Sequence, residues 1–139
     1  MNDYIGHPRQ TRGVEQYVLQ NGRGNGMRFM YIRNGCGLEV WLSLDRAGDV
    51  SRVNFQGDNM GYFAPCGYVA PSYYDGCGAG FLKSFTAGFF TTCGLTAVGS
   101  PCTDEGEELP LHGTISHIPA QLIGIEETKD ELTVKLKIT

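Results

Sequence analysis

Residues 81–116 read FLKSFTAGFFTTCGLTAVGSPCTDEGEELPLHGTIS. An apolar run with interspersed glycines leads into an acidic loop at residues 104–108, and the stretch closes on Leu111, His112 and Gly113. Glycine within an apolar run is typical of places where a ligand or another backbone approaches closely. Histidine titrates near neutral pH. The stretch therefore predicts the wall and rim of a ligand pocket, with strands at residues 81–85 and 88–93 running through the centre of the fold.

Short β-rich segments separated by glycine turns flank this stretch. The clearest alternation lies in residues 131–138, where apolar and polar side chains take turns, as in a half-buried strand. Residues 38–44 alternate in the same way and place Trp41 on the face opposite the leucines. Further strands are expected at residues 15–20, 27–34 and 50–56, and a hairpin at residues 115–127 and 131–138. With 20 glycines and no helix-favouring runs, the sequence predicts an all-β fold, an antiparallel β-sandwich.

Size and charge narrow the possibilities further. A chain of 139 residues with 41% hydrophobic residues predicts one domain, residues 1–139, with a buried core. The net charge of −4 and the lack of a basic cluster argue against binding to nucleic acid or to an anionic membrane. The polar N-terminus lacks the apolar region of a signal peptide, and the longest apolar run contains Lys83. A cytoplasmic protein with no membrane association is expected.

The cysteines also favour a cytoplasmic protein. Their number is odd, five, and no two of them form a CxxC pair, so neither a metal site nor a disulfide framework is expected. We expect reduced, buried or half-buried thiols, with Cys93 as an inert member. No cofactor is expected.

Residues 59–80 form a long segment rich in glycine, proline and tyrosine. Such a loop in a small domain is commonly functional. We expect it to lie over one end of the sheet, with its aromatic side chains packed or lining a cleft. These are Tyr62, Phe63, Tyr73 and Tyr74.

The run FTAGFFTTCGL at residues 85–95, followed by GSP at 99–101, GEEL at 106–109 and LHGTIS at 111–116, resembles the core signature of a bacterial aldose-1-epimerase-like family. That family belongs to the galactose-mutarotase-like superfamily, and the similarity extends from about residue 27 to the C-terminus. It implies a large β-sandwich, sometimes called a supersandwich, of which this chain resembles the N-terminal half. It also implies a carbohydrate-binding cleft in which His112 contacts the ring oxygen or anomeric hydroxyl of a sugar, with Arg46 as a contact to sugar hydroxyls.

Mutarotation requires one group to take the proton of the anomeric hydroxyl while another protonates the ring oxygen. His112 is the candidate catalytic residue. A local acid–base pair of His112 with the carboxylate of Glu107 is chemically possible. Glu107, Arg46 and Trp41 are the candidate substrate-binding residues. In the family, the general acid and base come from the later half of the longer protein.

Each candidate also has a structural interpretation. His112 is equally typical of a rim histidine that hydrogen-bonds a turn, and Trp41 of a packed core aromatic. Arg46 suits an ion pair with its neighbour Asp45 that locks a turn. Glu107 lies in an acidic run of the kind that usually forms a solvated loop.

Three functional hypotheses remain open. The first is a carbohydrate-binding protein resembling aldose 1-epimerases, acting on a free sugar or sugar derivative. The second is a non-catalytic sugar-binding module on the same fold. The third is a half-sandwich that pairs with another chain or with a copy of itself, because the amphipathic segment at residues 131–138 leaves a strand edge without a later partner.

Overall fold

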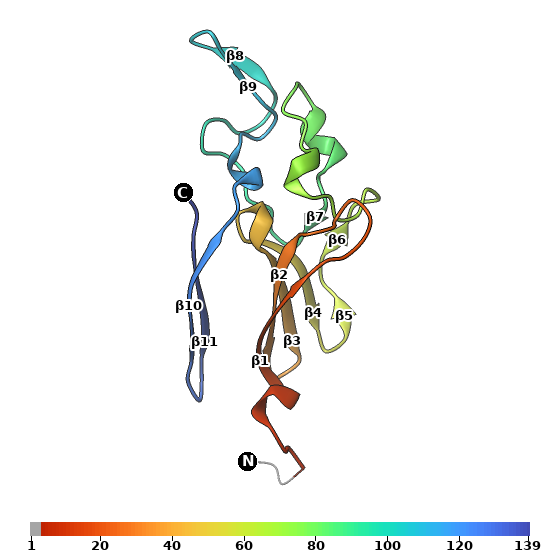
Figure 1. Ribbon diagram of the computed structural model, residues 1–139, viewed down its shortest axis with the longest axis vertical. Coiled ribbons are helices and arrows are strands. Elements are labelled where there is room, and N and C mark those ends of the chain that lie inside the picture. Colours follow the sequence, from red (N-terminus) through yellow and green to blue (C-terminus); the bar gives the residue numbers. More distant parts are fainter. Residues whose placement is uncertain (1–3) are drawn as a thin grey trace.

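The computed structural model describes residues 4–139 as a β-rich fold with short 3-10 turns (Figure 1). The strands are β1 (Arg12–Val18), β2 (Arg28–Asn34), β3 (Leu38–Ser43), β4 (Asp49–Phe55), β5 (Asp58–Asn59), β6 (Tyr62–Phe63), β7 (Ala87–Gly88), β8 (Cys102–Asp104), β9 (Glu107–Leu109), β10 (Gln121–Glu127) and β11 (Leu132–Lys137). The 3-10 turns are η1 (Pro8–Gln10), η2 (Leu44–Arg46), η3 (Pro71–Tyr73), η4 (Gly80–Lys83) and η5 (Ile115–His117). Within residues 4–139, no helix is long and apolar enough to cross a membrane.

The main layer is a five-stranded sheet in the order β1-β2-β3-β4-β5, in which every neighbouring pair is antiparallel. Three further two-stranded ladders complete the fold: β6 with β7, β8 with β9, and β10 with β11. The predicted all-β, antiparallel fold class is therefore confirmed. The strands predicted at residues 27–34, 38–44 and 50–56 correspond to β2, β3 and β4, whereas the strand predicted at residues 15–20 begins and ends earlier, as β1.

The hairpin β10–β11 covers one face of the main sheet (Figure 1). Val14, Met30 and Leu44 form the buried centre of this contact. Partly buried side chains from both layers surround them: Ile32, Leu42, Leu122, Leu132, Val134 and Leu136. Burial of each aliphatic side chain is worth about 1.5–3 kcal/mol when complete. This interface is the reason that residues 132–137 alternate so regularly.

The opposite face of the sheet carries aromatic and charged side chains. Tyr31 of β2 stacks on Trp41 of β3 with ring centroids 4.5 Å apart, and Phe29 packs between Tyr17 and Tyr68. Tyr68 comes from the long loop at residues 59–80. Through Tyr68 this loop packs on the aromatic face of the sheet, at the end of the sheet that contains Phe29 and Ser51. Trp41 is half-buried there.

The centre of residues 81–116 differs from its prediction. Residues 81–85 are not a strand, because η4 occupies Gly80–Lys83, and residues 88–93 contribute only Gly88 to a ladder. The chain turns at Ala87 (φ 63°) and Gly88 (φ 138°), and a Cβ added to Gly88 would lie 2.9 Å from the Val50 carbonyl oxygen. The apolar side chains that follow, Phe89 and Phe90, are 43% and 66% exposed.

The end of the stretch also differs from its prediction. Residues 115–117 form η5, and the hairpin strand begins only at Gln121. The acidic residues 104–108 form the turn of the β8–β9 hairpin. All five cysteines are free, and four of them, including Cys93, are exposed rather than buried.

Candidate functional site

A hollow of about 120 Å³ lies beside His112. Its lining residues are Phe81, Phe85, Thr91, Cys93 and His112. Ligand pockets typically occupy about 300–1,000 Å³, so this hollow is smaller than a complete ligand pocket. The centroids of the two phenylalanine rings lie 5.2 Å apart. The lining thus combines aromatic rings with the polar side chains of Thr91 and His112.

His112 is held by its own backbone and by Gly99. The His112 N–H donates to the Gly99 carbonyl at 2.9 Å, and the Gly99 N–H donates to His112 Nδ1 at 3.3 Å. A ring nitrogen that accepts a hydrogen bond carries no proton, so the neutral imidazole carries its proton on Nε2. The edge of the Phe81 ring packs against the imidazole with centroids 5.4 Å apart. His112 thus forms the hydrogen bond to a loop that its structural interpretation predicts. It also lines the hollow.

The glycine after His112 is required by close backbone contact. Gly94 and Gly113 form an isolated bridge, and a Cβ on Gly113 would lie 2.2 Å from the Gly94 carbonyl oxygen. His112 itself has φ 61° and Gly113 has φ 75°, so both lie in the left-handed region. The His-Gly dipeptide is therefore a turn that presents the imidazole from a tightly packed backbone.

A buried ion pair fixes the wall that contains Thr91 and Cys93. Asp49 Oδ1 accepts the Thr92 N–H at 2.6 Å, and its Oδ2 accepts from Arg46 Nε at 3.2 Å. Arg46 also donates from Nη1 to the Ser84 carbonyl at 3.2 Å, next to Phe85. Burial raises the pKa of Asp49, and the hydrogen bonds from Thr92 and Arg46 oppose that rise. Arg46 Nη2 is buried and has no hydrogen-bond partner within residues 4–139.

A second histidine lies on another side of Phe81. The ring of His117 stacks on Tyr74 with centroids 3.3 Å apart and meets Phe81 edge-on at 5.9 Å. Burial, together with the positive charge of Arg46, lowers the pKa of His117 to about 4. His117 is therefore neutral at pH 7. Its place in this aromatic cluster was not predicted, since residues 115–127 suggested an ordinary strand.

The four predicted site residues occupy different places. His112 lines the hollow, and Arg46, only 2% exposed, lies behind it in the ion pair with Asp49. Glu107 is exposed on β9 opposite Asp104, and Trp41 lies on the sheet. Among residues 4–139, no hydrogen bond, ion pair or ring contact joins these four to one another, so sugar contacts by Arg46, Glu107 and Trp41 stay predictions.

The predicted Asp45–Arg46 lock is wrong. Asp45 pairs instead with Arg28, whose Nη2 lies 2.5 Å from Oδ1, and Arg46 pairs with Asp49. Arg46 ends η2 and Asp49 begins β4, so the pair closes the turn between these two elements. Within residues 4–139, no three His, Cys, Asp or Glu side chains gather in a way that holds a metal ion.

The fold is similar to that of a solved structure. It is the crystal structure, at 1.90 Å resolution, of a protein from Klebsiella pneumoniae subsp. pneumoniae MGH 78578 that is described as a "putative aldose 1-epimerase". The TM-score is 0.69 at 24% identity, and the match covers 90% of this chain and 39% of the other. This chain thus spans well under half of that protein's length. The predicted resemblance to aldose-1-epimerase-like proteins is confirmed for the fold.

No curated protein matches the chain. A family match covers residues 24–139, which include the whole of the hollow beside His112, and its description is "Domain of unknown function (DUF4432)". The matched residues make up most of the chain. The protein therefore belongs to the DUF4432 family.

Proposed function

We propose that this protein binds a carbohydrate in the hollow beside His112, with the imidazole donating a hydrogen bond from Nε2 to a sugar oxygen. The observation that carries the proposal is the orientation of His112, whose Nδ1 is occupied by the Gly99 N–H. This leaves Nε2–H as the donor of the neutral ring. The fold shared with a protein described as a putative aldose 1-epimerase supports a carbohydrate as the ligand.

The lining of the hollow suits a sugar ring. Phe85, whose ring packs against the buried Phe81, offers apolar surface for the carbon-bound hydrogens of a sugar, and Thr91 adds a hydroxyl that both donates and accepts. Small-molecule sites are typically apolar with a few fixed polar groups. Arg46 and Asp49 act in this proposal as positioning residues, because they fix the backbone at Ser84 and Thr92.

In the catalytic form of the proposal, the protein interconverts the anomers of a free sugar. A carboxylate takes the proton of the anomeric hydroxyl, and the ring oxygen, which accepts the hydrogen bond from His112 Nε2, takes up a proton as the ring opens. None of the residues that line the hollow is a carboxylate. The catalytic form therefore needs a base that is not among the residues lining this hollow.

The second candidate is a sugar-binding module without turnover. The lining of the hollow, which contains no carboxylate among the residues that the structure describes, favours such a module. Such a module needs the rings and the Nε2–H donor but no acid–base pair.

The test measures anomer exchange by NMR on a panel of free aldoses, together with sugar binding by titration, for the chain and for His112→Asn. Asparagine tolerates the positive φ at this position and lacks an imidazole. His7→Asn, at an exposed histidine in the N-terminal turn, is the matched control.

Sugar binding that weakens in His112→Asn and persists in His7→Asn is the expected result. Exchange that accelerates in the same pattern would support the catalytic form, and binding without exchange would support the module. A folded chain that binds none of the aldoses would overturn both.

A further inference from the structure

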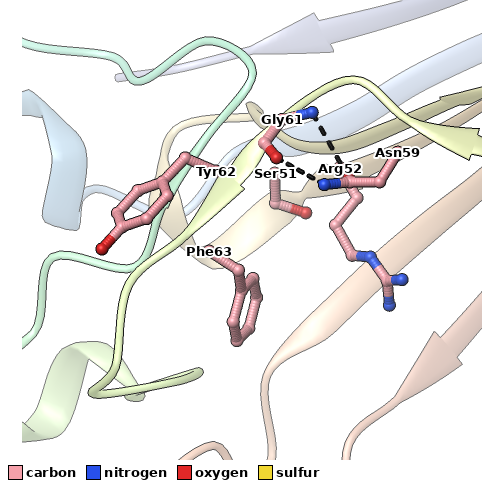
Figure 2. Close-up of a pocket in the computed structure, with 6 residues that line it drawn as sticks. All are labelled: Ser51, Arg52, Asn59, Gly61, Tyr62 and Phe63. Carbon is pink, nitrogen blue, oxygen red and sulfur yellow. Dashed lines mark hydrogen bonds between the residues drawn. The ribbon is translucent and has the colours of Figure 1, made fainter.

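A larger hollow lies apart from His112, on the aromatic face of the main sheet. Its volume is about 300 Å³, and Ser51, Arg52, Asn59, Gly61, Tyr62 and Phe63 line it (Figure 2). None of these residues lines the hollow beside His112. Figure 2 shows the side chains of Arg52 and Phe63 extending to the same side with Ser51 between them, whereas Tyr62 turns away. The volume reaches the lower end of the range for ligand pockets.

Arg52 brings an unpaired positive charge to this hollow. Its guanidinium lies over the Trp41 ring, 5.1 Å from the centroid. Within residues 4–139 it has no ion pair, in contrast to Arg12, Arg28, Arg33 and Arg46, which each pair with a carboxylate. A guanidinium that stacks on an aromatic face keeps its N–H donors at the edge, where they match a carboxylate in a bidentate arrangement.

Neutral groups surround that charge. Ser51 Oγ donates to the Trp41 carbonyl at 3.1 Å and lies 3.4 Å from the Tyr68 hydroxyl. The Tyr68 ring in turn packs edge-on against Phe63 with centroids 4.9 Å apart. Burial raises the pKa of Tyr68, so its phenol is neutral at pH 7. The described surroundings thus offer hydroxyls and rings to Arg52 but no anion.

The rim of the hollow is held in place before any ligand arrives. The Asn59 side chain donates from Nδ2 to the Gly61 carbonyl at 2.5 Å, and the Gly61 N–H donates back to its Oδ1 at 3.3 Å. Gly61 is also packed against Gly88, where an added Cβ would lie 3.3 Å from the Gly88 carbonyl carbon. A rim fixed in this way reduces the entropy lost on binding.

We propose that this hollow binds a small ring-shaped carboxylate, with the carboxylate on the Arg52 guanidinium and the ring face against Phe63. The planar, unpaired guanidinium selects a planar anion, and Phe63 selects a ring. Ser51 lines the hollow, and its hydroxyl lies 3.4 Å from that of Tyr68, so Ser51 is the hydroxyl that would meet a polar atom of the ligand. An aromatic acid and a sugar acid share this chemistry. The site does not depend on the carbohydrate proposed at His112.

The test is a titration followed by NMR, with benzoate and glucuronate as probes and with benzyl alcohol and glucose as their neutral counterparts. It compares the unmodified chain with Arg52→Gln and with Phe63→Leu. Arg23→Gln is the matched control, because Arg23 also lies over an aromatic ring, 5.6 Å from the Tyr73 centroid, and does not line the hollow. His112→Asn separates this site from the other.

At least one carboxylate probe is expected to bind more tightly than its neutral counterpart. Arg52→Gln is expected to weaken that binding roughly tenfold or more, the usual effect of losing a charged hydrogen bond. Phe63→Leu should weaken it by less, and Arg23→Gln and His112→Asn should leave it unchanged. Preference for benzoate would assign an aromatic acid, and preference for glucuronate a sugar acid. Failure of both probes to bind, or binding that both Arg52→Gln and Phe63→Leu leave intact, would overturn the proposal.

Discussion

Arg46 Nε donates to Asp49 Oδ2 at 3.2 Å, and both side chains are buried, with 3% and 2% of their surface exposed. The pair links η2 to β4, and through Ser84 and Thr92 it fixes two segments that frame the hollow beside His112. The charges of Arg46 and Asp49 therefore contribute to the hollow beside His112 by fixing the backbone at Ser84 and Thr92.

Arg46→Met is expected to lower the free energy of unfolding by about 3 kcal/mol or more, because it leaves Asp49 buried without its cation. Urea unfolding followed by circular dichroism measures the loss. The double variant Arg46→Met/Asp49→Leu removes both charges and should recover part of it. Lys135→Met, which breaks an exposed pair with Glu126, is the control and should cost less than about 1 kcal/mol. An equally small loss in Arg46→Met would contradict the role of the buried pair.

The tight contact at Gly113 predicts a second effect. Gly113→Ala would place a Cβ 2.2 Å from the Gly94 carbonyl oxygen and 2.5 Å from the Ala97 carbonyl oxygen, so the backbone that carries His112 must move. Gly106→Ala is a matched control, since Gly106 also has positive φ (85°) but nothing within 4 Å of an added Cβ.

Gly106→Ala is expected to cost about 1–2 kcal/mol, the usual strain of alanine in the left-handed region. Gly113→Ala should cost clearly more in the same urea titration and should shift the NMR signals of His112. Equal losses in the two variants would show that the close approach to Gly94 is not rigid.

Periodicity in the sequence predicted the sheet and hairpin well, because the alternation at residues 38–44 and 131–138 is local and records burial directly. The same reasoning failed at residues 81–93, where apolar residues occur without a period. Their conformation depends on positive φ at Ala87 and on contacts with Val50, far away in sequence.

The hollow beside His112 was predicted only in part. The His-Gly dipeptide marked His112, but the other groups that build the site depend on long-range packing. Asp49 reaches Thr92 across 43 residues, and Phe81 and Tyr74 meet His117 through irregular loops. No local pattern carries that information.

His117 predicts a pH dependence of stability. Its pKa of about 4 in the folded protein lies below the ordinary value of 6.5, so between these two values the unfolded chain binds more protons than the folded one. The free energy of unfolding should therefore fall as the pH drops from about 6.5 to about 4, by roughly 1–2 kcal/mol for this half-buried ring.

The measurement is the difference between the unmodified chain and His117→Phe, which keeps a ring against Tyr74, in urea titrations from pH 7.5 to 4. The difference isolates His117 from Asp49, whose raised pKa acts in the opposite direction at low pH. The stability gap between the two proteins should move in favour of the phenylalanine variant as the pH falls. Parallel curves would show that His117 is not protected from protons in the folded state.

Shortening a side chain on the face of the hairpin β10–β11 that packs on the main sheet is expected to lower stability locally. Leu136 packs into the core shared with the main sheet and reaches the backbone at Gly48, where an added Cβ would lie 2.8 Å from its Cδ1. Leu136→Ala should cost about 2 kcal/mol, at the low end for leucine because the site is only partly buried. Ile123 lies at the bulge of the same hairpin and is 56% exposed, so Ile123→Ala should cost much less.

Hydrogen exchange distinguishes opening of the hairpin from unfolding of the whole protein. Leu136→Ala should accelerate hydrogen exchange relative to the unmodified chain. If β10–β11 is held mainly by its contact with the sheet, this acceleration should be larger for the amides of β11 than for the amides of β2. Ile123→Ala should leave both sets nearly unchanged. Equal acceleration in β2 and β11 would mean instead that hairpin and sheet unfold as one unit, and that Leu136 contributes to a single cooperative core.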